Sequence, residues 1–101
     1  MTFLLQDTAL VAAGAALLDQ EFEGWETQID LDLLDLANGD NCILAQLYGD
    51  YEGGLSDLGV DGTDHGFYLA GTLTWRSEAE DARWATLTEL WIIEIQNRTG
   101  E

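Results

Sequence analysis

Apolar positions near the amino terminus recur at the spacing of one helix face. Asp7 or Thr8 is a suitable N-cap residue, and the pattern behind it predicts a helix that runs to about Gln20. The residues of the apolar stripe are Leu10, Val11, Gly14, Leu17, Leu18 and Phe22. Acidic residues Asp19, Glu21 and Glu23 then stand at the carboxyl end, where the helix dipole favours cations. Acids at this end are tolerated for solubility or serve binding.

The stretch IDLDLLDL, residues 29–36, places an acid at alternate positions before the alternation fails. Residues 24–39 as a whole have a non-helical pattern, and the Asn-Gly-Asp sequence at 38–40 is a turn signal. Alternation over 29–33 predicts a short extended segment with Ile29, Leu31 and Leu33 inward and Asp30 and Asp32 outward. Leu34, Asp35 and Leu36 break that register.

A second helical pattern follows Asp40, which is a candidate N-cap. Glycines at positions 49, 53 and 54 interrupt this pattern and indicate a kink or a close helix contact, and Gly59 is placed to end it. The apolar stripe consists of Leu44, Leu47, Tyr48, Tyr51, Leu55 and Leu58.

The last third combines a strand-like segment with a third helix. Residues 67–75 have strand composition, with residues 29–33 or 2–5 as candidate pairing partners. Ser77 and Glu80 form a capping box before a helix that extends to about Arg98, with Trp84, Leu87, Trp91 and Ile95 on its apolar face. The chain is therefore expected to be mainly α with a minor β element (α+β). One compact domain, residues 1–101, would pack about three helices around one core with one or two short strands.

Charge limits the partners that such a domain can have. The 101 residues include 20 acids, three Arg and no Lys, giving a formal net charge of -17. Thirteen of the acids lie between Asp19 and Asp64, a range without Lys or Arg. Direct binding to nucleic acid or to an anionic membrane is therefore not expected, and an electrostatically favoured partner should be basic. The longest apolar run, 9–18, is too short for a membrane span, and with one cysteine the expected compartment is the cytoplasm.

Oxygen-rich loops raise the question of a divalent metal ion. Asp30, Asp32, Asp35 and Asp40 could supply oxygen ligands, but their spacing does not fit a calcium loop, and a solvated acidic face is favoured. Residues 61–65, Asp-Gly-Thr-Asp-His, are a second oxygen-rich loop and are read as a common turn.

The remaining candidate chemistry is sparse, and neither a cofactor nor an enzymatic activity is expected. Cys42 and His65 are the only soft ligands, too few for a structural zinc site. Anionic surroundings raise the pKa of a thiol, which disfavours a nucleophilic role for Cys42. Cys42 is therefore interpreted as a small buried residue. Trp84 and Trp91 are assigned to the core, whereas Trp25 and Trp75 could be core residues or exposed anchors for a partner.

Several motifs resemble those of a group of small acidic proteins encoded by actinobacteria and their bacteriophages. The motifs are GWETQIDLDLLDL at 24–36, CILAQLYGDYEGGLSDLG at 42–59, HGF at 65–67 and LTELW at 87–91. The resemblance covers most of residues 14–95, and Ala45 departs from it by replacing a glycine. It implies a high-GC host or its phage and assigns no catalytic residue.

These observations predict an acidic interaction protein, associated with a phage or mobile element, that binds a basic host protein. Such a protein could imitate nucleic-acid phosphates or act as an inhibitor of a nucleic-acid-binding protein. The alternatives are a charge that serves only solubility, or a divalent-metal-binding domain. The candidate partner-binding residues are Asp30, Asp32, Asp35, Glu23, Glu26, Trp25, Asp50 and Glu52.

Overall fold

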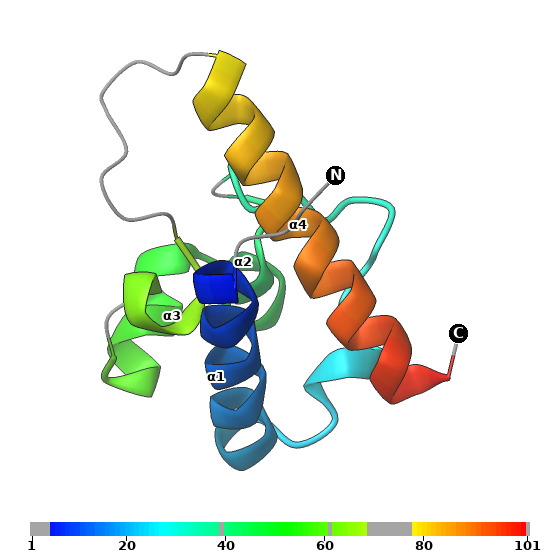
Figure 1. Cartoon of the computed structure of the whole chain (residues 1–101). Coiled ribbons are helices and arrows are strands. Elements are labelled where there is room, and N and C mark those ends of the chain that lie inside the picture. The colour runs from blue at the N-terminus through cyan, green and yellow to red at the C-terminus, as the bar shows by residue number, and fades with distance from the viewer. Residues whose placement is uncertain (1–4, 39, 61, 69–77, 101) are drawn as a thin grey trace.

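A computed structural model describes residues 5–38, 40–60, 62–68 and 78–100 (Figure 1). It contains the helices α1 (Leu5–Glu21), α2 (Ile43–Tyr48), α3 (Tyr51–Leu58) and α4 (Glu78–Thr99), with short 3-10 helices η1 (Trp25–Thr27) and η2 (Gly62–His65). Within those ranges there is no β-strand, so the predicted minor β element is wrong for the described chain. The fold is mainly helical, and α1 and α4 pack against each other.

Helix α1 confirms the amino-terminal helix and corrects its start. The helix begins at Leu5, so Asp7 and Thr8 lie within its first turn and are not N-caps. Val11, Gly14 and Leu18 of the predicted stripe are buried, while the other three members are half-buried. The stripe therefore faces the core as its spacing predicted.

Gly14 allows α1 to approach the rest of the core closely. A methyl group in its place would overlap the carbonyl oxygen of His65 and touch the Trp91 indole. Trp91 is fully buried and donates its Nε1 proton to the carbonyl oxygen of Gly66 at 2.7 Å. Its ring stacks on Phe67, with centroids 5.4 Å apart, and meets Trp25 edge to face at 5.8 Å. This aromatic cluster fixes η1, η2 and α4 around one centre.

The second predicted helix is two helices, and its N-cap is not Asp40. Cys42 is the N-cap of α2, with its Sγ accepting a hydrogen bond from the backbone N–H of Ala45 at 3.4 Å. Gly49 ends α2 with φ +97°, a conformation that requires glycine, and α3 begins directly afterwards. The break predicted from Gly49 is therefore complete, and the helices pack against each other with Gly54 close to Leu44.

Asp50 is the N-cap of α3 and accepts a hydrogen bond from the backbone N–H of Gly53. Gly59 ends the helix at φ +68°, as the sequence predicted, and its N–H donates to the carbonyl oxygen of Leu55.

Residues 28–38 and 40–42 are irregular, in place of the predicted extended segment, and are referred to below as the irregular loop. Ile29 is buried and Leu31 half-buried, but Leu33, expected in the core, is 56% exposed. Leu34 and Leu36 are buried in its place. The reason is local: carboxylate and amide side chains accept hydrogen bonds from the backbone two residues ahead and turn the chain repeatedly. The donor and acceptor pairs are Asp32 N to Asp30 Oδ1, Ala37 N to Asp35 Oδ1 and Asp40 N to Asn38 Oδ1.

Side chains from other elements supply the hydrogen bonds that a neighbouring strand would have supplied. The Gln46 Oε1 accepts from the backbone N–H of Asp30 at 2.6 Å, and its Nε2 donates to the Asp30 carbonyl at 3.3 Å. Further along, the N–H of Leu36 donates to the Thr88 hydroxyl of α4 at 3.0 Å. The loop is thus anchored to α2 and α4.

Helix α4 confirms the last predicted helix and its buried face. It ends at Thr99, one residue after the expected Arg98, and all four residues of the predicted stripe are buried. Phe67 is buried and Tyr68 exposed, and neither lies in a strand. The rest of the predicted strand, Trp75 and the proposed cap Ser77 lie outside the described residues, as do residues 2–4.

Candidate functional site

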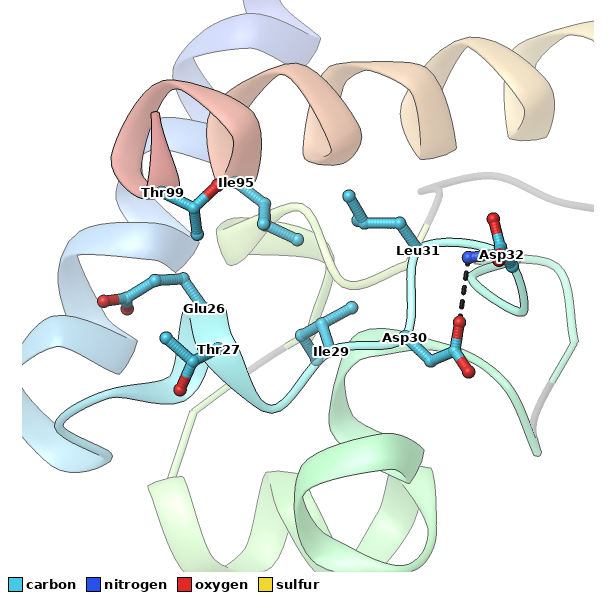
Figure 2. A pocket seen from close by; sticks show the side chains of 8 residues that line it. All are labelled: Glu26, Thr27, Ile29, Asp30, Leu31, Asp32, Ile95 and Thr99. Atoms are coloured by element: carbon cyan, nitrogen blue, oxygen red, sulfur yellow. Dashed lines mark hydrogen bonds between the residues drawn. The ribbon is translucent and has the colours of Figure 1, made fainter. Parts of the chain in front are cut away.

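An open groove of about 520 Å³ lies between residues 26–32 and the carboxyl end of α4 (Figure 2). Its walls come from η1, the start of the irregular loop and the last turns of α4. The side chains of Ile29, Leu31 and Ile95 converge on its floor, while acidic side chains stand at its two ends. The lining residues are Glu26, Thr27, Ile29, Asp30, Leu31, Asp32, Ile95 and Thr99.

The η1 wall is fixed by an aromatic and ionic network around Trp25. Trp25 is fully buried and donates from Nε1 to Asp19 Oδ1 at 2.9 Å. The Arg98 guanidinium lies 5.8 Å from the Trp25 ring and pairs with Asp19 at 2.9 Å and Glu94 at 3.2 Å. Trp25 is therefore a core residue with no exposed face. Its prediction as a partner-binding residue is wrong.

The same network explains one acid at the carboxyl end of α1. Asp19 stands where the helix dipole is unfavourable for an anion. The Asp19 carboxylate accepts a hydrogen bond from the Trp25 indole and pairs with Arg98, and these two interactions offset the unfavourable helix dipole. Asp19 thereby joins α1, η1 and α4. Asp19 thus has a structural role, which the sequence pattern did not reveal because both partners depend on the tertiary fold.

The opposite wall is fixed through Gln46. Its side-chain amide makes two hydrogen bonds with the backbone of Asp30 and a third to the carbonyl oxygen of Asn41 at 3.1 Å. The Asp30 carboxylate accepts from the Asp32 N–H at 3.0 Å, which holds the turn at that end of the groove. The backbone of this wall is therefore held in place before any partner arrives.

The eight candidate partner-binding residues do not form one patch. Glu26, Asp30 and Asp32 line the groove, and Glu23 is exposed in the turn before η1. Asp35 is exposed further along the loop, with its carboxylate bound to the Ala37 N–H. The remaining acids, Asp50 and Glu52, lie at the start of α3, which is on the opposite side of α1 from η1 (Figure 1).

Five lining residues were not among the candidate partner-binding residues: Thr27, Ile29, Leu31, Ile95 and Thr99. Ile29 and Leu31 were expected only to face the core. Ile95 was recognised only as part of a buried helical face, and nothing near it or Thr99 in the sequence points to residues 26–32. Their position becomes apparent only when the end of α4 packs against η1.

The acids of the described residues do not assemble into a recognisable metal centre. In the part of the chain that the structure describes, no group of three or more His, Cys, Asp or Glu side chains is placed to hold a metal ion. Asp30 and Asp35 instead accept turn hydrogen bonds. In the 61–65 loop, Asp61 lies outside the described residues, and the His65 ring stacks on Phe67 with centroids 6.4 Å apart.

Cys42 is positioned as a structural cap and not as a nucleophile. Its side chain is buried, as the sequence predicted. Burial raises the pKa of the Cys42 thiol, and the charge of Asp40 adds a smaller rise against the opposing effect of backbone hydrogen bonds. The raised pKa keeps the sulfur protonated at neutral pH, where the thiolate needed for attack is disfavoured.

Comparison with known proteins gives no relative for this chain: no family model, no curated protein and no solved structure matches it. Among the described helices, none combines the length and apolar character needed to cross a membrane.

Proposed function

We propose that this protein is an acidic interaction protein that binds a basic protein in the cytoplasm of a bacterial host. The observation that supports the proposal most strongly is the net charge of -17, produced by 20 acids against three Arg. Arg98, one of those three, is already paired with Asp19 and Glu94 inside the fold. The negative field of the surface is therefore poorly compensated, and a basic surface would be attracted to it over a long range.

The surface acids that support binding to a basic partner are mostly exposed, and their carboxylates make few contacts within the protein. Glu23, Asp32 and Glu52 are exposed, and none of their carboxylates makes a hydrogen bond or ion pair with another described residue. Their charges are available to a partner. Association should be fast and should weaken strongly as salt screens the field.

The groove favours interaction over a charge that serves only solubility. Solubility needs dispersed surface charge, whereas here carboxylates flank a depression with aliphatic side chains at its floor. A combination of apolar centre and charged rim is typical of protein-binding surfaces. The resemblance to small actinobacterial and phage-encoded acidic proteins supports a phage or mobile-element setting for this interaction.

The proposal is tested by affinity capture from an actinobacterial lysate, with the protein as bait and elution along a salt gradient. A second folded protein of similar size and net charge serves as the control bait. The expected result is a discrete basic protein retained by this chain, absent from the control and released by salt. Displacement of that protein by DNA would identify a nucleic-acid-binding partner and support phosphate imitation. The same diffuse set of basic proteins on both baits would overturn the proposal and favour a role in solubility.

A further inference from the structure

The floor of the groove offers a limited apolar contact. Ile95 is 1% exposed and Ile29 8% exposed, so both are largely covered by the fold. Leu31 is half-buried and its side chain points along the floor toward Ile95 (Figure 2). Leu31 is therefore the main aliphatic surface that an incoming side chain could cover.

The two ends of the groove differ from its floor in having unpaired anions. Glu26 stands at one end and Asp32 at the other, with the aliphatic floor between them (Figure 2). Neither carboxylate makes a hydrogen bond or ion pair with another described residue, whereas the Asp30 carboxylate is occupied by the Asp32 N–H. No Lys, Arg or His is among the lining residues. The groove thus presents two free negative charges separated by an apolar centre.

This arrangement selects among classes of ligand. A hydrated inorganic cation would gain nothing from Leu31, and a neutral apolar group would gain nothing from the two carboxylates. A peptide segment with cations on both sides of an apolar side chain satisfies both features. The walls are held by the Trp25 network and by Gln46, so little ordering of the groove is needed on binding.

From these observations we infer that the groove binds a segment of the basic partner in which an apolar side chain lies between two cationic side chains. The inference rests on the proposed function and specifies its site. Glu26 and Asp32 contact the two cations, and Leu31 with the edges of Ile29 and Ile95 contacts the apolar side chain. Asp30 and Gln46 are positioning residues that hold the wall.

The test is a titration of the isotope-labelled full chain with short capped peptides at low salt, followed through amide chemical shifts. The first peptide is Arg-Gly-Leu-Gly-Arg, and its match in charge is Arg-Gly-Gly-Gly-Arg. The expected shifts cluster at residues 26–32 and 95–99, and the leucine peptide binds about threefold to tenfold more tightly than the glycine peptide. Leu31→Ala should abolish that preference. Leu33→Ala, at a 56% exposed leucine outside the groove lining, should retain it.

Two contrary outcomes have different meanings. If both arginine peptides bind but the shifts lie elsewhere, or the leucine gives no preference, the groove is not the site while the proposed function stands. If neither arginine peptide binds at low salt, the proposed function fails together with the inference. The peptide comparison uses the unmodified chain, so it decides the matter even if Leu31→Ala does not fold.

Discussion

The anchoring of the irregular loop by Gln46, at Asp30 and Asn41, leads to a direct prediction about stability. Replacing Gln46 with Met keeps the length of the side chain and removes its amide. The change eliminates three hydrogen bonds: two with the Asp30 backbone, at 2.6 and 3.3 Å, and one with the Asn41 carbonyl, at 3.1 Å. The loop has no neighbouring strand among the described residues that could replace them.

The expected cost follows from the exposure of these bonds. A protein hydrogen bond contributes about 0.5–1.5 kcal/mol net, and those of Gln46 are exposed or only partly buried, so water partly replaces them. The low end of the range applies, and Gln46→Met should lower the free energy of unfolding by about 1.5 kcal/mol. For a domain of this size, that loss lowers Tm by about 6–12 °C.

Chemical denaturation of Gln46→Met and of the matched variant Gln20→Met measures this cost. Gln20 is exposed on α1 and makes no side-chain hydrogen bond with another described residue, so its variant should stay within about 0.5 kcal/mol of the parent. Hydrogen exchange at the Asp30 amide should accelerate in Gln46→Met while exchange in α1 and α4 changes less. Equal stability of the two variants would refute the anchoring role of Gln46.

Four further predictions concern the core, the cap, the ionic network and the surface. Gly14→Ala should destabilise by about 1–3 kcal/mol in denaturant melts, because the added methyl overlaps the His65 carbonyl, although helix propensity alone predicts a gain of about 1 kcal/mol. The raised pKa of the buried Cys42 thiol makes the folded state hold its proton longer than the unfolded chain. The contribution of this thiol to the free energy of unfolding is therefore fully present below the ordinary thiol pKa of 9.0 and is lost as pH rises above it. Cys42→Ala should make stability fall less steeply in melts across alkaline pH. Arg98→Lys keeps the charge but loses the planar group over Trp25, and a loss of about 1 kcal/mol is expected; no loss in melts would argue against the network. Added salt should raise the Tm of the free protein, since it screens self-repulsion at -17, and a falling Tm would contradict this.

The long helices could be predicted because their apolar residues repeat at helical spacing and face one core. Residues of the α4 stripe, such as Trp84 and Ile95, are buried as expected, and Gly59 ends α3 as its position indicated. These features depend on local sequence and on a single buried face, which periodicity reports well.

The loop and the groove could not be predicted because side chains from distant positions determine them. Alternation over 29–33 suggested a strand, yet Gln46 and Thr88 satisfy the loop backbone and the turns expose Leu33. The N-cap of α2 is Cys42 and not Asp40, because the helix begins at Ile43. The Cys42 thiol accepts the hydrogen bond from the Ala45 N–H that a carboxylate more commonly accepts.

Within the candidate site, three acids of the groove could be predicted, whereas the pattern left Trp25 open between a core residue and an exposed anchor, and its listing among the partner-binding residues is wrong. Trp25 is buried because Asp19 and Arg98, far apart in the sequence, enclose its indole. The acids themselves were easy to recognise from composition, but their division between the groove and α3 depends on the path of the loop.

The most direct test of localised binding compares two variants with the same change of charge. Glu26→Gln/Asp32→Asn removes two charges at the groove, and Asp57→Asn/Asp64→Asn removes two exposed charges from α3 and η2. The quantity measured is the Kd of each variant for the Arg-Gly-Leu-Gly-Arg peptide at one salt concentration. The groove variant should bind about threefold to tenfold more weakly than the other, because only it loses contacts with the two arginines. Equal weakening of both variants would show that the peptide responds to the overall field, and would contradict a binding site in the groove.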